Sequence, residues 1–318
     1  MKWISILYIM VLMLIAPLGA LGQTALDSSL ICLRQASSSS EPAIQEGLYK
    51  TAIGVKPDCA QCYFALGQLY LSQQKYNQAL SEFYFAEEYN PQLVGLHYYI
   101  GLAFETQNNF PSALDAYYLA IEGKSDLYLQ SQAHLSIGSI FDAIAMPESA
   151  AVHFQKAIEL DSASATAYFN LGITYDDRQM YEEAIKCYLK AHCLDTADTD
   201  IITNLGVAYC MTGNFDLAIG VFISGLALDP ENYRLNYNLA NAYQLNGELG
   251  AAHDKFEFTI KLQPAEAECY YRLAQVEESL GDFDSAAQNY DRFLELASPI
   301  YEIAVEEARR QLELIKNR

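Results

Sequence analysis

The chain has 318 residues, with 19 basic and 40 acidic side chains and a formal net charge of −21. This charge favours solubility and argues against nucleic acid as a partner, because a phosphate backbone would be repelled. The chain is also longer than one hydrophobic core usually supports, unless it is built from units that pack only on their neighbours.

Residues 1–22 differ in composition from the rest of the chain. Lys2 is their only charge, a nearly apolar run begins at Trp3, and the small residues Ala20 and Gly22 precede Gln23. This layout is typical of a secretory signal peptide that is cleaved before Gln23. Two alternatives remain: an uncleaved membrane anchor, because the apolar run approaches the roughly 18–20 residues that span a bilayer, or a buried helix.

Residues 23–59 are predicted to form an N-terminal cap, or a degenerate copy of the repeat that follows them. We expect a short first helix, then a loop through the serine run that ends at Ser40. A second helix is expected from Pro42 to Ile53. Terminal units of repeat proteins are commonly atypical, so a weak pattern here is consistent with a cap.

Residues 60–300 contain seven copies of one pattern. Each copy has a small residue in each half, and an aromatic residue follows the second small residue by four positions. Successive copies are 34 residues apart, except for one spacing of 37, which places a three-residue insertion near residues 124–130. Apolar spacings of three and four predict two amphipathic helices per copy, and the small residues would let these helices approach closely. The first small residues are Gly67, Gly101, Gly138, Gly172, Gly206, Ala240 and Ala274, and the second are Ala79, Ala113, Ala150, Ala184, Ala218, Ala252 and Ala286.

The pattern resembles the tetratricopeptide repeat, whose motif has Leu-Gly and Tyr in the first helix, then Ala and an aromatic residue in the second. Gly172, Tyr175, Ala184 and Tyr188 match these positions in the copy at residues 165–198. The resemblance implies an all-α fold, an α-solenoid or right-handed superhelix of about seven helix hairpins. Glu277 replaces the first-helix tyrosine in the last copy, so we expect that copy to be less tightly packed.

Residues 301–318 are predicted to form a C-terminal capping helix. One apolar stripe would cover the last repeat while the charged residues face water. The stripe consists of Tyr301, Ala304, Ala308, Leu312 and Ile315.

Cys59 and Cys62 form a CxxC motif at the junction between the N-terminal region and the first repeat. Three interpretations remain: ordinary packing thiols, a structural disulfide that could instead involve Cys32, or redox or metal chemistry. A second CxxC is missing from the sequence, so a four-thiolate zinc site is not predicted. The sequence also lacks the common hydrolase, metalloprotease and nucleotide-binding motifs. We therefore expect no catalytic residues, no metal and no cofactor.

The candidate binding residues lie in the C-terminal repeats. The resemblance implies that first helices line a concave groove. The residue before Leu-Gly is Asn170, Asn204 and Asn238 in three consecutive repeats, which is similar to the asparagine ladder of O-linked N-acetylglucosamine transferase. An amide has one acceptor and two donors, so it can hydrogen-bond both backbone groups of an extended peptide. The alternative is that Asn is merely common at this position of the repeat. Nearby candidates are Tyr237, Asn241, Tyr271 and Arg272.

The sequence thus predicts an exported, non-catalytic scaffold, periplasmic or extracellular, that binds an extended segment of another protein in its groove. Its acidity favours basic or neutral segments. The alternative is a membrane-tethered envelope-assembly factor that keeps its N-terminal helix and uses the same repeats. Membrane contact is expected only in that case.

Overall fold

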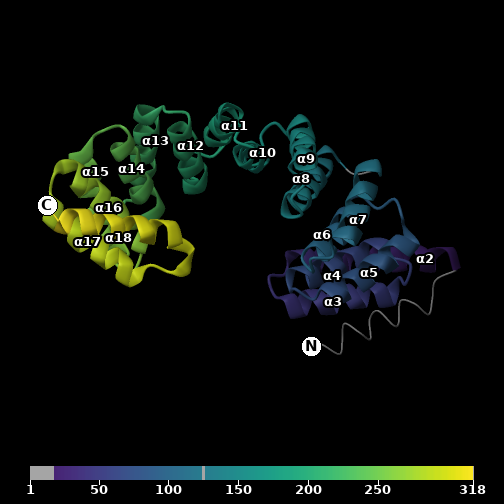
Figure 1. Ribbon diagram of the computed structural model, residues 1–318. Coiled ribbons are helices and arrows are strands. Elements are labelled where there is room, and N and C mark those ends of the chain that lie inside the picture. Colours follow the sequence, from purple (N-terminus) through teal and green to yellow (C-terminus); the bar gives the residue numbers. More distant parts are fainter. Residues whose placement is uncertain (1–17, 124–125, 318) are drawn as a thin grey trace. The chain divides into compact units, whose positions relative to one another are not determined.

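The computed structural model describes residues 18–123 and 126–317, with side chains from residue 28 onward. In these ranges the chain forms α-helices, one short 3₁₀ helix (η1) and no β-strand (Figure 1). The all-α prediction is confirmed. The elements are α2 (Leu18–Ser38), α3 (Pro42–Val55), α4 (Ala60–Ser72), α5 (Tyr76–Tyr89), α6 (Leu96–Glu105), α7 (Phe110–Glu122), α8 (Leu127–Ala143), α9 (Pro147–Leu160), α10 (Ala165–Asp177), α11 (Tyr181–Leu194), α12 (Thr199–Met211), α13 (Phe215–Leu228), α14 (Tyr233–Leu245), α15 (Leu249–Leu262), α16 (Ala267–Leu280), α17 (Phe283–Leu296), η1 (Pro299–Tyr301) and α18 (Glu302–Lys316).

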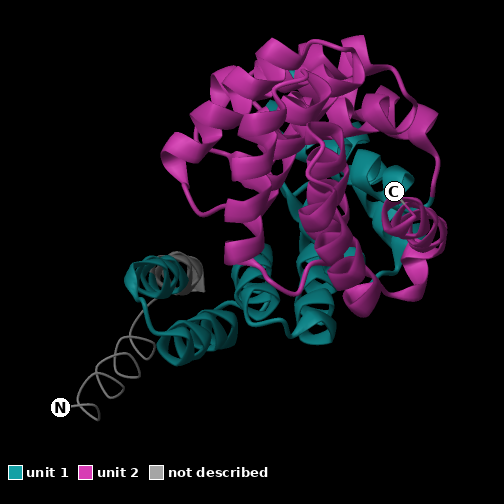
Figure 2. Ribbon diagram, turned by 60° about the vertical axis from the view of Figure 1, so that its left-hand side comes forward, with its two compact units in different colours: residues 1–144, 159–161 teal, residues 145–158, 162–318 magenta. Residues whose placement is uncertain are grey.

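Consecutive helices pack as hairpins. The most extensive contacts join α2 to α3, α4 to α5, α6 to α7, α10 to α11, α12 to α13, α14 to α15 and α16 to α17. The second helix of a hairpin also contacts the first helix of the next, as α11 contacts α12 and α13 contacts α14. The chain divides into two compact units, residues 1–144 with 159–161 and residues 145–158 with 162–318 (Figure 2). Each unit is therefore a stack of hairpins in which most contacts join neighbours along the chain.

The small residue of the first helix is required by the aromatic ring of the second helix. A Cβ atom added to Gly172 would lie 2.5 Å from Cε1 of Tyr188, and one added to Gly67 would lie 2.5 Å from Cε1 of Phe83. Tyr188 and Phe83 are completely buried. The predicted columns of small and aromatic residues thus meet directly, and the ring fills the space that the missing side chain leaves.

The turn inside each hairpin has one residue in the left-handed region. It is glycine in three hairpins, whereas in the other four a residue with a Cβ atom takes this conformation. These residues are Gln74 (φ 60°), Asn108 (57°), Ala145 (58°), Gln179 (59°), Gly213 (75°), Gly247 (81°) and Gly281 (84°). They have the same spacings as the small residues, so the repeat fixes the turn as well as the helices.

The N-terminal part differs from the expectation in two respects. The first helix was expected to be short, whereas α2 has 21 residues. α2 also continues to Ser38, so the first two of the four serines expected to lie in a loop are helical, and the Ser37 and Ser38 hydroxyls donate to carbonyls three residues earlier. These bonds satisfy the hydroxyls without ending the helix. The predicted signal segment, residues 1–22, lies largely outside the described residues. Within the described ranges, no helix has both the length and the apolar character needed to span a bilayer.

The insertion and the last repeat can both be located. α8 has 17 residues where the corresponding helix α10 has 13, so the longer spacing is accommodated beside the start of α8. The last repeat is not loosely packed, contrary to expectation. Glu277 is only 4% exposed, and its carboxylate accepts a 2.8 Å hydrogen bond from Asn289 Nδ2. Burial raises the pKa of Glu277, as expected for a carboxylate with little access to water.

Candidate functional site

The predicted binding residues all lie on the first helices of the C-terminal hairpins. Asn170 is on α10 and Asn204 on α12, while Tyr237, Asn238 and Asn241 are on α14. Tyr271 and Arg272 are on α16. All seven side chains are half-buried. Because α12 contacts both α10 and α14, and α14 contacts α16, these residues follow one another along a single face, which we call the first-helix face.

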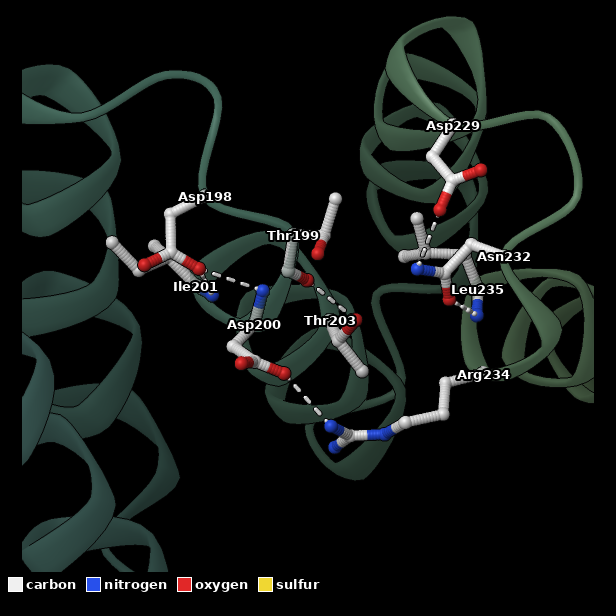
Figure 3. A network of polar contacts seen from close by, with 9 residues as sticks. All are labelled: Asp198, Thr199, Asp200, Ile201, Thr203, Asp229, Asn232, Arg234 and Leu235. Atoms are coloured by element: carbon white, nitrogen blue, oxygen red, sulfur yellow. Dashed lines mark hydrogen bonds and ion pairs between the residues drawn. The ribbon is translucent and has the colours of Figure 1, made fainter.

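The starts of these helices are fixed by side-chain caps. Ser164 Oγ accepts a hydrogen bond from Ala167 N, Asp198 Oδ1 accepts from Ile201 N, and Asn232 Oδ1 accepts from Leu235 N. Each cap satisfies a backbone donor that has no partner within its helix. Figure 3 shows two of these caps, at the starts of α12 and α14. The caps set where each helix begins, and with it the position of the residues on the first-helix face.

The three asparagines Asn170, Asn204 and Asn238 do not bond to one another. In the part of the chain that the structure describes, their side-chain amides also have no hydrogen bond to any other group. Neighbouring asparagines in this set of three therefore do not satisfy each other's amides. Each amide still has two donors and one acceptor available.

Four residues of α14 and α16 form a connected polar cluster. The Tyr237 hydroxyl interacts with the Glu268 carboxylate and the Asn241 amide, and burial followed by the Glu268 bond raises the pKa of Tyr237. Arg272 Nη2 lies 3.8 Å from Glu268 Oε1. Tyr237 and Asn241 are therefore already engaged within the protein, unlike the three asparagines.

The two candidate tyrosines are also partly used in packing. Tyr237 lies edge-on to Phe256, with ring centroids 6.0 Å apart. Tyr271 is tilted against Phe293 at 5.0 Å and lies edge-on to Tyr290 at 6.0 Å. Each ring thus presents only part of its surface, since its remaining area covers the second helix of its own hairpin.

Three charged residues on this face were not predicted. Asp200, Arg234 and Glu268 each precede Asn204, Asn238 and Arg272 by four positions, so each lies one helical turn away on the same face. Arg234 Nη1 donates to Asp200 Oδ1 at 2.8 Å, linking α14 to α12 (Figure 3). Their shared position could have been found from the sequence, because Asp200, Arg234 and Glu268 are 34 residues apart, as the repeats are. The first-helix face therefore has two internally neutralised acid–base pairs beside the asparagines.

The CxxC motif lies far from this face in the sequence, at the start of α4. Cys59 and Cys62 form a disulfide, and both residues are buried. Cys32 packs beside them as a free thiol, so pairing through Cys32 is not the arrangement found. Within the described residues, no group of three or more His, Cys, Asp or Glu side chains is placed to hold a metal ion.

Comparison with known proteins identifies the repeat. A tetratricopeptide-repeat model matches residues 165–195, and a second model of the same description matches residues 64–128, 204–257 and 237–299, about half of the chain. Comparison with curated proteins finds no match.

Solved structures share the architecture. The C-terminal part of a repeat protein from Cytophaga hutchinsonii is 18% identical, with a TM-score of 0.63 and coverage of 76% of this chain and 98% of that one. YrrB, described as a TPR protein with an unusual peptide-binding site, is 21% identical, with a TM-score of 0.52 over 62% of this chain and 99% of its own. MamA is 25% identical, with a TM-score of 0.50 over 52% and 90%. At these identities the first two similarities establish the fold alone.

Proposed function

The chain belongs to the tetratricopeptide-repeat family, whose helical scaffold binds proteins and peptides, and on this premise we propose that it binds an extended segment of a partner protein along the first-helix face. The observation that supports this best is the row of free amides at Asn170, Asn204 and Asn238. They recur every 34 residues on consecutive, contacting helices. Amides at regular intervals can bond the backbone of an extended chain without selecting its sequence.

We also propose that the protein acts outside the cytoplasm, without catalysis. The leader-like composition of residues 1–22 supports export. The Cys59–Cys62 disulfide agrees with it, because disulfides persist mainly in oxidising compartments. Sequencing the N-terminus of the mature protein tests this proposal. A start at Gln23 is expected, whereas a retained N-terminus would favour the membrane-tethered alternative.

The binding proposal is tested by replacing the three asparagines together with alanine. Each lost amide bond weakens binding by about 0.5–1.5 kcal/mol, so the triple variant should lose more than about tenfold in affinity. The measurement is in-cell cross-linking followed by capture and mass spectrometry, with wild type and variant compared for the same partner. A thermal melting curve, monitored by circular dichroism, checks that the variant folds.

A matched control removes three exposed amides from second helices. Gln78, Gln155 and Gln288 are exposed residues on α5, α9 and α17. Their triple alanine variant should capture the partner as wild type does. Undiminished capture by the asparagine variant would overturn the proposal and show that Asn is only a common residue at this position.

A further inference from the structure

The C-terminal helix α18 continues the register of the first helices. Ala308 follows Ala274 by 34 residues and is completely buried, as the small residue of a first helix is. It packs in the same cluster as Tyr290 and Phe293 of α17. α18 therefore occupies the place of a first helix in an eighth unit. By the same spacing, Glu302 corresponds to Glu268 and Glu306 to Arg272, so both carboxylates extend the first-helix face.

A hollow lies between α16, η1 and α18. Its volume is about 740 Å³, and its lining includes Tyr271, Ile300, Ile303, Glu302 and Glu306. Ile300 and Ile303 are 84% and 86% exposed. Isolated exposed apolar side chains are ordinary, but two isoleucines beside one hollow with a half-buried tyrosine provide an apolar surface that a partner could cover.

The charge of the hollow is negative. Glu307 accepts hydrogen bonds from Arg310 Nη2 at 2.6 Å and from Gln311 Nε2 at 2.7 Å, so this acid is neutralised. Glu302 and Glu306 are exposed, and neither has an ion pair among the residues that the structure describes. Two uncompensated carboxylates thus flank Ile303. Elsewhere on the first-helix face, by contrast, Asp200 and Glu268 each have an arginine.

We propose that this hollow binds a large apolar side chain of the partner segment, flanked by lysine or arginine. The proposal rests on the binding of an extended segment to the first-helix face, and it identifies the chemistry of one end of that segment. The apolar side chain would cover Ile300 and Ile303. The basic groups would pair with Glu302 and Glu306, which are spaced by four residues on one face of α18.

The test uses two fluorescent peptides of twelve residues. Both have the same uncharged Ala/Ser/Thr sequence, and they end in Lys-Leu-Lys or in Glu-Leu-Glu, each placed in turn at either terminus. Fluorescence anisotropy gives the Kd for the full-length protein. We expect the Lys-Leu-Lys peptide to bind at least tenfold more tightly, and Glu302→Lys with Glu306→Lys to reverse the preference. A control with the same change in charge outside the hollow, Asp291→Lys with Glu313→Lys, should keep it.

The outcomes separate this inference from the function on which it rests. The triple asparagine variant should weaken both peptides without changing their ratio. Equal binding of the two peptides to wild type would overturn the proposal for the hollow but leave the proposal of binding along the first-helix face standing. Failure of both peptides to bind would overturn both proposals. A dimer in solution that Ile303→Lys converts to monomers would assign the hollow to a second copy of the chain, which also overturns the inference.

Discussion

At the scale of single residues, three repeats have a buried tyrosine as the aromatic residue of the second helix. In two of these three repeats the tyrosine hydroxyl donates a hydrogen bond to a carboxylate. The Tyr117 hydroxyl donates to Glu105, and the Tyr290 hydroxyl donates to Glu278 at 3.1 Å, each pair being twelve residues apart. The third pair, Asp176 and Tyr188, has the same separation. There, however, Asp176 Oδ1 and the Tyr188 hydroxyl are both buried without a partner in the protein. Aspartate is one methylene shorter than glutamate and does not reach the hydroxyl.

The variant Asp176→Glu should therefore complete the missing hydrogen bond. We expect the free energy of unfolding to rise by about 1 kcal/mol, since a buried hydroxyl and one buried carboxylate oxygen would both be satisfied. In the wild type, burial and, to a smaller extent, repulsion from Asp177 raise the pKa of Asp176, because both disfavour its charged form. Urea denaturation measures the change. In a Tyr188→Phe background the gain should vanish, and a gain of the same size there would contradict the assignment to the hydroxyl.

At the scale of the helical hairpin, the turn determines how the two helices meet. Gln179 and Gly213 occupy the same position in consecutive repeats, both in the left-handed region, with φ of 59° and 75°. A residue with a Cβ atom is strained in that region, whereas glycine is not. A Cβ atom at Gly213 would meet nothing within 4 Å, so the backbone alone decides the cost there.

The two turns therefore predict opposite results for reciprocal substitutions. Gln179→Gly should raise the free energy of unfolding by about 0.5–1 kcal/mol, and Gly213→Gln should lower it by about 1 kcal/mol. Thermal melting of both single variants and of the double variant measures this, and the double variant should lie close to wild type. A loss of stability from Gln179→Gly would show that contacts of the glutamine side chain outweigh backbone strain.

At the scale of the whole molecule, the charge of −21 opposes the compact state. The Debye length falls from about 30 Å at 0.01 M salt to about 10 Å at 0.1 M, so salt screens this repulsion. Tm should rise by roughly 2–4 °C between 10 and 300 mM NaCl, equivalent to about 1 kcal/mol. The same screening also weakens exposed ion pairs, but this costs little stability, because each such pair contributes little to the free energy of unfolding. A fall in Tm measured by calorimetry would mean that attractive pairs dominate.

The sequence predicted much of the fold because its repeat spacing records contacts directly. Gly172 and Tyr188 could be paired from spacing alone, since a small residue and a ring recur together. One further step of 34 from Ala274 would also have identified Ala308 and the register of α18. The spacing of 34 placed Asp200 and Arg234 at the same position of consecutive repeats, but it could not predict their ion pair, because side-chain direction depends on how consecutive helices cross. For the same reason, only the structure shows that the Asn204 amide is free while Asn241 is engaged by Tyr237.

The ion pair between Asp200 and Arg234 affects what happens when whole repeats are gained or lost during evolution. The glycine–aromatic contacts and the tyrosine–carboxylate bonds each lie within one repeat. Duplication or deletion of a whole 34-residue module would therefore leave these contacts intact in the repeats that remain. The ion pair joins the same position of two successive modules, where the residues run Thr166, Asp200, Arg234, Glu268 and Glu302. Loss of the module that contains Asp200 would place Thr166 next to Arg234 and leave the arginine unpaired. Gene rearrangement could thus preserve the scaffold while scrambling the order of charges that its partner meets.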